Sequence, residues 1–288
     1  MPEVTVGVSL QDALQSATAV LERAGCATPR LDAELLLGAA LGVGRERLVL
    51  DAAMDLDPAA LARLGRLVAR RCGHEPVAYI IGHKEFRHIS LAVDSRVLIP
   101  RPETELLVEV GLSLPDGARV LDVGTGSGAV ALALKHERPD LEVWGTDVSA
   151  DAIAVAGENA RRLGLDVRFV QGDLLDDAPA GLDAVLANLP YVAEDSQLAP
   201  EISYEPRAAL FGGPDGLDVI RRLAAIVSQI QLVALEVGGG QASDVPGQPA
   251  AVAGQAPEVA ALLRRTGFQA IEVLQDLAGH ERVVVARR

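Results

Sequence analysis

The stretch Val120-Leu121-Asp122-Val123-Gly124-Thr125-Gly126-Ser127-Gly128 joins a short apolar run to a turn that contains three glycines. Short apolar runs of this kind are typical of buried strands. Glycines let the backbone turn tightly and let a ligand approach it closely. The residues that follow, Ala129–Lys135, are mostly apolar and predict a helix. The stretch therefore predicts the strand–turn–helix unit with which α/β sheets bind nucleoside ligands.

Strands and helices alternate from residue 118 onward, which is the signature of a doubly wound α/β sheet. The strands are expected at Val120–Val123, Glu142–Gly145, Val167–Val170, Ala184–Ala187, Leu232–Glu236, Ala270–Leu274 and Arg282–Ala286. The helices are expected at Ala129–Lys135, Ala150–Leu163, Asp215–Val227 and Pro257–Thr266. The last two strands have no helix between them, so an antiparallel hairpin should close one edge of the sheet. A flexible loop is expected at Gly238–Ala256, which is rich in Gly, Pro, Ala and Gln.

The N-terminal part of the chain predicts a separate helical domain. Ser9 with Asp12 resembles a capping box, and Asp57-Pro58 supplies an N-cap and a first-turn proline. The pattern then changes to two β-like runs, Val77–Ile81 and Ile89–Val93, around Gly82. We therefore expect a helical domain over residues 1–75, a β-hairpin linker over 76–100 and the α/β domain over 101–288.

Composition and charge narrow the classes of function. The 26 Lys and Arg against 40 Asp and Glu give a net charge of −14, so the chain has no overall basic surface for nucleic acid. Its two cysteines, Cys26 and Cys72, are too few for a disulfide framework, and its five histidines are scattered, so no metal site is expected. No stretch approaches the ~18 consecutive apolar residues of a membrane span. A cytoplasmic protein without membrane contacts is expected.

Three carboxylates stand at the ends of successive strands, where open α/β sheets bind ligands. The glycine turn also fits the Ala-ended dinucleotide fingerprint, so a nicotinamide cofactor stays open at this point. Asp147 could accept both ribose hydroxyls of either ligand. Asp122 could hold the ammonium group of S-adenosylmethionine through water or backbone, and Asp173 could bind an adenine amino group. Three acids around one crevice suit a sulfonium cation better than a pyrophosphate.

A short loop after the fourth strand, Asn188-Leu189-Pro190-Tyr191, resembles the Asn-Pro-Pro-Tyr loop of methyltransferases that act on planar amide or exocyclic amino nitrogens. Such a nitrogen is a poor nucleophile because its lone pair is delocalised. An Asn oxygen and a backbone carbonyl can each accept one of its N–H groups and so aim the lone pair at the methyl group. Tyr191 would pack against the planar group.

Further segments resemble the release factor glutamine methyltransferase family over most of the chain. They are Arg71–Gly82, Val97–Glu105, Glu201–Arg207 and Leu210–Gly216. The string Pro-Arg-Pro-Glu-Thr-Glu at residues 100–105 is the most specific of them, and it is also compatible with a proline-started helix. The resemblance implies a Rossmann-like, seven-stranded class I methyltransferase domain that follows an N-terminal helical domain.

The resemblance also implies roles for individual residues. S-adenosylmethionine, with S-adenosylhomocysteine as its product, would be bound by Gly124, Thr125, Gly126, Ser127, Gly128, Asp147, Leu174 and Asn188. Asp122 and Asp173, argued above from their positions, complete the predicted cofactor site. The target glutamine would be held by Asn188, Leu189, Pro190 and Tyr191, which are also the catalytic residues, with Glu103 and Thr104 on the substrate side. The partner would be a peptide chain release factor, docked with help from the helical domain and methylated on the N5 of a glutamine.

One residue departs from the family pattern, because Leu189 stands where the first loop proline is expected. The backbone carbonyl survives this change, but the fixed φ is lost, so binding of S-adenosylmethionine is expected to persist while catalysis weakens. Three alternative functions are also compatible with the sequence. They are a nucleic-acid adenine or cytosine amino methyltransferase, a nicotinamide-dependent oxidoreductase, and a cofactor-binding protein that has lost its activity.

Overall fold

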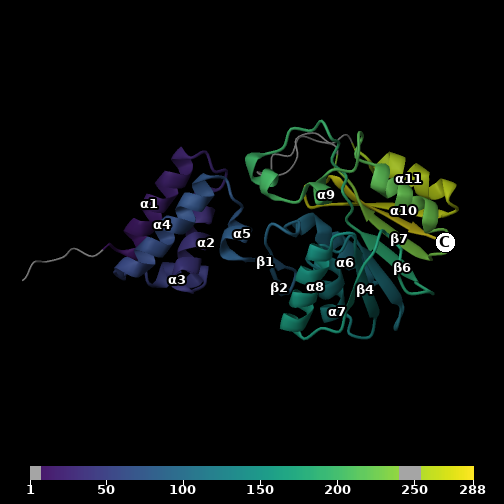
Figure 1. The fold of residues 1–288 in the computed structure, drawn as a ribbon, viewed down its shortest axis with the longest axis horizontal. Helices are drawn as coiled ribbons and strands as arrows, with labels where there is room; N and C mark the ends of the chain where they lie inside the picture. The colour runs from purple at the N-terminus through teal and green to yellow at the C-terminus, as the bar shows by residue number, and fades with distance from the viewer. Residues whose placement is uncertain (1–7, 240–253) are drawn as a thin grey trace, which may run out of the picture. The chain divides into compact units, whose positions relative to one another are not determined.

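The computed structural model describes residues 8–239 and 254–288. These residues form two compact units (Figure 1). The helical unit consists of the chain up to Gly82 together with Pro200–Tyr204. The sheet unit consists of His83–Ala199 and Glu205–Arg288.

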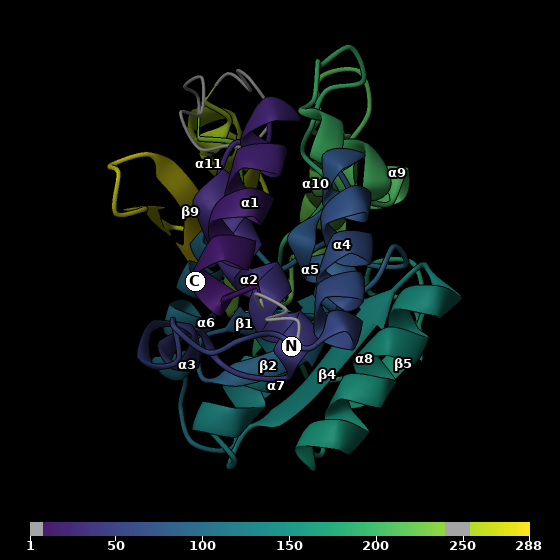
Figure 2. The same cartoon turned by 90° about the vertical axis from the view of Figure 1, so that its left-hand side faces the viewer.

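The helical unit contains α1 (Leu10–Arg23), α2 (Pro29–Leu41), α3 (Arg45–Leu50), α4 (Pro58–Cys72) and α5 (Val77–Ile81). Helices α1, α2 and α4 pack against one another (Figure 2). Both predicted caps are present: the backbone N–H of Asp12 donates to Ser9 Oγ at 3.1 Å, and that of Ala60 donates to Asp57 Oδ1 at 2.7 Å. Such caps satisfy N–H groups that have no partner inside the helix.

The short 3-10 helix η2 (Pro200–Tyr204) belongs to the helical unit through side-chain contacts. The guanidinium of Arg71, which is buried, pairs with Asp32 at 2.7 Å and with Glu201 at 3.0 Å. The hydroxyl of Tyr204 donates to the carbonyl of Gly73 at 2.7 Å. A segment distant in sequence therefore completes this unit.

The prediction of a strand at Val77–Ile81 is wrong, because these residues form α5. The backbone N–H of Ile80 donates to the carbonyl of Pro76, and the helix ends at Gly82, whose φ is 81°. Five apolar residues carry too little periodicity to separate a strand from a helical turn. The hairpin itself exists, but its strands are β1 (His83–Phe86) and β2 (Ile89–Ala92), both in the sheet unit. The division of the chain at residues 75 and 100 stays a prediction.

The main sheet has seven strands, as predicted, in the order β5-β4-β3-β6-β7-β9-β8. The strands are β3 (Arg119–Val123), β4 (Glu142–Asp147), β5 (Arg168–Gln171), β6 (Ala184–Ala187), β7 (Leu232–Glu236), β8 (Ala270–Gln275) and β9 (Glu281–Arg287). Neighbours among β3 to β7 run parallel, and β9 is antiparallel to both β7 and β8. The predicted antiparallel hairpin at the edge is thus confirmed.

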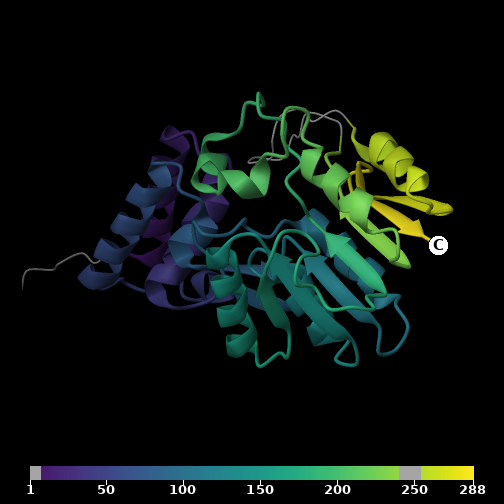
Figure 3. The same cartoon turned by 45° about the vertical axis from the view of Figure 1, so that its right-hand side comes forward.

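Helices cover both faces of this sheet (Figure 3). One side carries α6 (Glu105–Leu112), α7 (Ala129–Glu137) and α8 (Ala150–Leu163), and the other carries α10 (Asp218–Ile226) and α11 (Ala256–Arg265). The short η1 (Pro102–Thr104) and α9 (Arg207–Leu210) lie in connections. The predicted loop Gly238–Ala256 falls largely outside the described residues. Every helix in the described ranges is too short or too polar to cross a bilayer.

The strand order places a binding crevice at the ends of β3 and β6. From β3 the chain proceeds outward through β4 to β5, then returns to β6 on the other side of β3. Ligands of open α/β sheets bind at such a reversal, beside the carboxyl ends of the strands.

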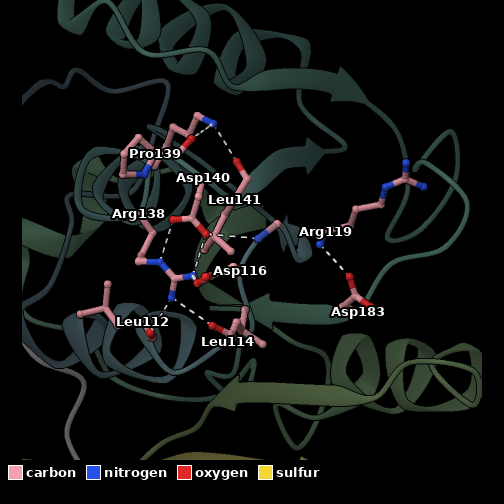
Figure 4. A network of polar contacts seen from close by, with 11 residues as sticks. Leu112, Leu114, Asp116, Arg119, Arg138, Pro139, Asp140, Leu141 and Asp183 are labelled. Atoms are coloured by element: carbon pink, nitrogen blue, oxygen red, sulfur yellow. Dashed lines mark hydrogen bonds and ion pairs between the residues drawn. The ribbon is translucent and has the colours of Figure 1, made fainter.

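Polar contacts fix the opposite ends of the same strands (Figure 4). Arg138, which follows α7, donates to the carbonyls of Leu112 and Leu114 at 2.8 and 3.0 Å. The backbone N–H of Arg119 donates to Asp183 Oδ2 at 2.8 Å. These hydrogen bonds join the connections that precede β3, β4 and β6, so they hold the amino ends of these strands together.

Candidate functional site

A cavity of about 280 Å³ lies at the carboxyl ends of the central strands. Its lining comes from the glycine turn after β3, the end of β4, the segment after β5 and the loop after β6. Predicted site residues in its wall are Gly124, Gly126, Asp147, Asp173, Leu174, Asn188, Leu189 and Pro190. The structure therefore brings together residues that are as far apart as 66 positions in sequence, Gly124 and Pro190. A pocket at this position is where the fold is expected to hold a small ligand.

The glycine turn lies directly against the loop after β6. The backbone N–H groups of Gly124 and Thr125 donate to the carbonyl of Thr146 at 2.8 and 2.9 Å, which fixes the turn to β4. Gly124 has a φ of +72°, and a Cβ there would lie 3.2 Å from Leu189 Cδ2. A side chain would therefore be strained and would press on the loop, so glycine keeps this part of the cavity open.

Asp147 ends β4 with its carboxylate at the cavity. Its Oδ2 accepts from the backbone N–H of Gly126 at 3.0 Å, and its Oδ1 accepts from that of Ser149 at 2.9 Å. Burial raises the pKa of Asp147, and these two bonds oppose that shift. A carboxylate has about four acceptor positions, so it can still accept from two hydroxyl groups of a ribose. The arrangement fits a nucleoside.

Asp122 is placed behind the cavity wall. Its Oδ2 accepts from Thr125 Oγ1 at 2.7 Å and from the backbone N–H of Ala131 at 3.2 Å, and the side chain is buried. The carboxylate thus braces the turn, and a role toward an ammonium group through water or backbone stays a prediction. Ser127 and Gly128 are likewise outside the lining, and the carbonyl of Ser127 accepts from Asn159 Nδ2 at 3.0 Å.

Burial raises the pKa of Asp122 to about 7, from an ordinary value of 3.8. Between these two pH values the folded chain holds a proton that the unfolded chain has lost, so stability falls as the pH rises through this window. In Asp122→Asn the side chain stays neutral, and this term disappears. We expect the melting temperature of the wild type to fall relative to that of Asp122→Asn between about pH 4 and pH 7. Parallel curves of Tm against pH would contradict this account.

The segment after β5 places Leu174 in the cavity wall with a backbone φ of 56°. Its carbonyl accepts from Thr146 Oγ1 at 2.8 Å, which holds this uncommon conformation for a branched residue. The neighbouring Asp173 also lines the cavity, but its Oδ2 pairs with Arg222, and both side chains are about half exposed. The carboxylate of Asp173 keeps further acceptor positions, and its predicted contact with an adenine amino group stays a prediction.

The loop Asn188–Tyr191 begins at the cavity and turns into the protein. Asn188 Nδ2 donates to Thr104 Oγ1 at 2.9 Å, and Leu189 is 4% exposed in the wall. Tyr191 is outside the lining of this cavity. Its hydroxyl faces Glu236 Oε1 at 3.4 Å, and burial raises the pKa of that hydroxyl. The predicted packing of Tyr191 on a planar substrate group stays a prediction.

Three residues that hold this loop were not assigned to the site from the sequence. Gln255 donates from Nε2 to the carbonyl of Tyr191 at 2.9 Å and accepts from the backbone N–H of Gly238 at 2.9 Å. A Cβ at Gly212 would lie 2.3 Å from the carbonyl oxygen of Pro190, and one at Gly216 would lie 2.1 Å from that of Tyr191. The repeated glycines of Leu210–Gly216 were the available signal.

The string at residues 100–105 forms η1 and the start of α6, which confirms its interpretation as a proline-started helix. Arg101 pairs with Glu205, whose Oε2 accepts from the backbone N–H of Ile99 at 3.1 Å. This anchoring places buried Thr104 beside Asn188, while Glu103 contributes to the electrostatic environment of Glu236. Direct contact of Glu103 or Thr104 with substrate stays a prediction.

Within the described part of the chain, no group of three or more His, Cys, Asp or Glu side chains is arranged to hold a metal ion.

Comparison with known proteins identifies both units. Residues 12–82 match the family described as the PrmC N-terminal domain, and residues 102–212 match the methyltransferase small domain. The hMettl16 catalytic domain, solved in complex with the MAT2A 3′UTR hairpin 6, has a TM-score of 0.54 at 15% identity. That likeness covers 77% of this chain and 81% of that one, and it bears on the fold alone. The predicted Rossmann-like methyltransferase fold is confirmed.

Two bacterial relatives match nearly the whole chain. The release factor glutamine methyltransferase of Deinococcus radiodurans is 41% identical over 286 residues, which is 98% of this chain and 99% of the relative. That of Moorella thermoacetica is 41% identical over 296 residues, with the same shares. Identity at this level over both full lengths means that the chain belongs to the release factor glutamine methyltransferase family.

Proposed function

We propose that this chain transfers the methyl group of S-adenosylmethionine to the side-chain amide nitrogen of the glutamine in the Gly-Gly-Gln motif of peptide chain release factors. The observation that carries the proposal is the position of Asn188. This residue lines the cavity and its Nδ2 is bonded to Thr104, so Oδ1 is left to accept from a substrate N–H. Family membership supports the same activity.

The cavity suits the nucleoside part of the cofactor. Asp147 would accept from the ribose hydroxyls, and the adenine would lie between apolar wall residues such as Leu174 and Leu189. Gly124 and Gly126 let the ligand approach the backbone of the turn, which a side chain at Gly124 would obstruct. When bound, S-adenosylmethionine supplies a methyl group activated by its sulfonium charge.

The loop after β6 would hold the acceptor. Asn188 Oδ1 and the backbone carbonyl of Leu189 each accept one N–H of the glutamine amide, which turns the nitrogen lone pair toward the methyl carbon. S-adenosylmethionine, held at Asp147 and the glycine turn, would supply the methyl carbon to this lone pair, and the electron pair of the carbon–sulfur bond would stay with sulfur. One amide proton then leaves to solvent, so no strong base is needed before transfer.

The substrate partner is proposed to be a protein in the cytoplasm. The net charge of −14 disfavours a polyanionic substrate, because phosphate backbones would be repelled. The helical unit, which matches a family-specific N-terminal domain, is proposed to help dock the release factor.

Intact-protein and peptide mass spectrometry of a purified release factor test the proposal. After incubation with this chain and S-adenosylmethionine, we expect the release factor to gain the mass of one methyl group, located on the glutamine of its Gly-Gly-Gln motif. A reaction that includes excess S-adenosylhomocysteine is the control and should show no gain. An unmodified release factor, in the presence of enzyme shown to bind S-adenosylhomocysteine, would refute the proposed acceptor.

Leu189→Pro is expected to raise turnover by about two- to fivefold. Proline would fix the φ angle of this residue. The loop would then lose less conformational entropy when it adopts the active geometry, a saving of about 0.4–1 kcal/mol. Steady-state methyl transfer measures the effect. Leu189→Ala is the matched control, because it also removes the side chain that packs near Gly124 but leaves φ free. Unchanged or lower turnover in Leu189→Pro would count against a weakened loop in this chain.

A further inference from the structure

Thr104 is a buried residue close to both Asn188, in the loop after β6, and Glu236, a second buried polar residue. It is 4% exposed, and its Oγ1 accepts from Asn188 Nδ2 at 2.9 Å. The carboxylate of Glu236, which is 1% exposed at the end of β7, is also close to this hydroxyl, and a hydrogen bond from Thr104 lowers the pKa of Glu236. Three elements therefore meet at the hydroxyl of Thr104: η1, the loop that follows β6, and the end of strand β7.

The hydroxyl of Thr104 can settle which way the Asn188 amide faces. A hydroxyl has one proton to donate, and an ionised carboxylate can only accept. When the proton of Thr104 points to Glu236, Oγ1 is left as an acceptor, and only the NH₂ side of the amide can bond to it. Oδ1 of Asn188, a residue that lines the cavity, must then face away from Thr104.

Glu236 has the acceptor capacity that this arrangement needs. Its Oε1 is 3.4 Å from the Tyr191 hydroxyl, and its Oε2 has no hydrogen-bond partner within the described part of the chain. Burial raises the pKa of Glu236 to about 7, and Glu103 adds to this shift, while the hydrogen bond from Thr104 and the charges of Arg282 and Arg101 oppose it. The carboxylate is therefore ionised above about pH 7. The hydroxyls of Thr104 and Tyr191 are the donors beside this buried carboxylate, which needs donors because it is out of water, so the proton of Thr104 is drawn to it.

We propose that Thr104 and Glu236 are positioning residues that fix the orientation of the Asn188 amide, so that Oδ1 is presented to the N–H of the acceptor glutamine. The inference rests on the proposed function, because it concerns the same amide. Without the hydroxyl, Asn188 Nδ2 would lose its buried hydrogen-bond acceptor. Turning the amide would then be favourable, because its NH₂ group could form a hydrogen bond on the substrate side. An NH₂ group there would oppose the N–H of the acceptor instead of accepting from it.

Thr104→Val and Thr104→Ser provide the matched pair, because valine keeps the shape without the hydroxyl and serine keeps the hydroxyl without the methyl. We expect kcat for methyl transfer to a release factor to fall about 10- to 100-fold in Thr104→Val, as the loss of a buried hydrogen bond predicts. Thr104→Ser should stay within about threefold of the wild type, a change of under one kcal/mol in the barrier. Affinity for S-adenosylhomocysteine should be unchanged in both, which also shows that the variants are folded.

A double-mutant cycle separates positioning from a general structural effect. If Thr104 acts through Asn188, Thr104→Val should cause no further loss of kcat in an Asn188→Ala background. Glu236→Met, which removes the acceptor of the Thr104 proton, should lower kcat in the same direction and covers the case in which Thr104→Val does not fold. Full activity of Thr104→Val or Glu236→Met, equal losses in Thr104→Ser and Thr104→Val, or multiplying losses in the cycle would each overturn the inference. A wild type that transfers no methyl group would refute the proposed function as well, so the two failures are distinguishable.

Discussion

Asn188→Ala is expected to lower the turnover of methyl transfer to a release factor by about 100- to 1,000-fold, the usual cost of removing one preorganised hydrogen-bonding group from a reacting centre. Alanine keeps the backbone of the loop but removes the oxygen that would orient the acceptor nitrogen. Since the cavity wall keeps Asp147, Leu174 and Leu189, binding of S-adenosylhomocysteine should change only slightly. Steady-state kinetics and calorimetric titration measure the two quantities separately.

Gln229→Ala is a suitable control for Asn188→Ala, because it removes an amide from an exposed position after α10. It should leave both turnover and binding unchanged. An Asn188→Ala variant that keeps more than about a tenth of the wild-type turnover would show that the Asn188 side chain does not orient the acceptor. A loss smaller than about tenfold raises the barrier by less than about 1.4 kcal/mol, which is too little for a group that orients the reacting nitrogen.

Gly216→Ala is expected to lose both stability and activity. Gly216 has a φ of +80°, and a Cβ there would lie 2.1 Å from the carbonyl oxygen of Tyr191 and 3.0 Å from Gln255 Nε2. The left-handed conformation alone costs about 1–2 kcal/mol for alanine. The contact also forces the loop after β6 to move, and a displacement of about 1 Å in a reacting site can lower a rate about 100-fold. Thermal denaturation and methyl-transfer kinetics test the two effects.

Gly157→Ala is the matched control for this substitution. Gly157 lies inside α8, and a Cβ added there meets nothing within 4 Å. Alanine should therefore stabilise the helix by about 0.5–1 kcal/mol and leave activity unchanged. A Gly216→Ala variant that melts and turns over like the wild type would contradict the close support of the loop.

The elements that the sequence predicted well are those whose signals are local. Helix α8 has its predicted limits, because Ser149 caps its first turn and Gly164, with a φ of 68°, ends it. The seven strands were recognisable because most of them are short apolar runs bounded by turn residues. The glycine turn and the loop after β6 could be placed on one sheet edge because parallel strands share their carboxyl ends.

The contacts that complete the site were not predictable, because they join residues far apart in the chain. Thr104 and Asn188 are 84 positions apart, and Gln255 is 64 positions from Tyr191. No periodicity or spacing reports such pairs. The burial of Asp122 was missed for a related reason, since the end of a strand does not say whether a carboxylate faces the cavity or the helix that follows. The packing of Leu189 near Gly124 was likewise not predictable, because no spacing in the sequence reports it.

Transfer of labelled methyl from S-adenosylmethionine to a purified release factor tests the central claim most directly, with the same factor carrying alanine in place of the Gly-Gly-Gln glutamine beside it. We predict label on the natural factor and none on the altered one. Equal label on both factors, or none on either while S-adenosylhomocysteine still binds, would contradict the assignment of that glutamine as the acceptor.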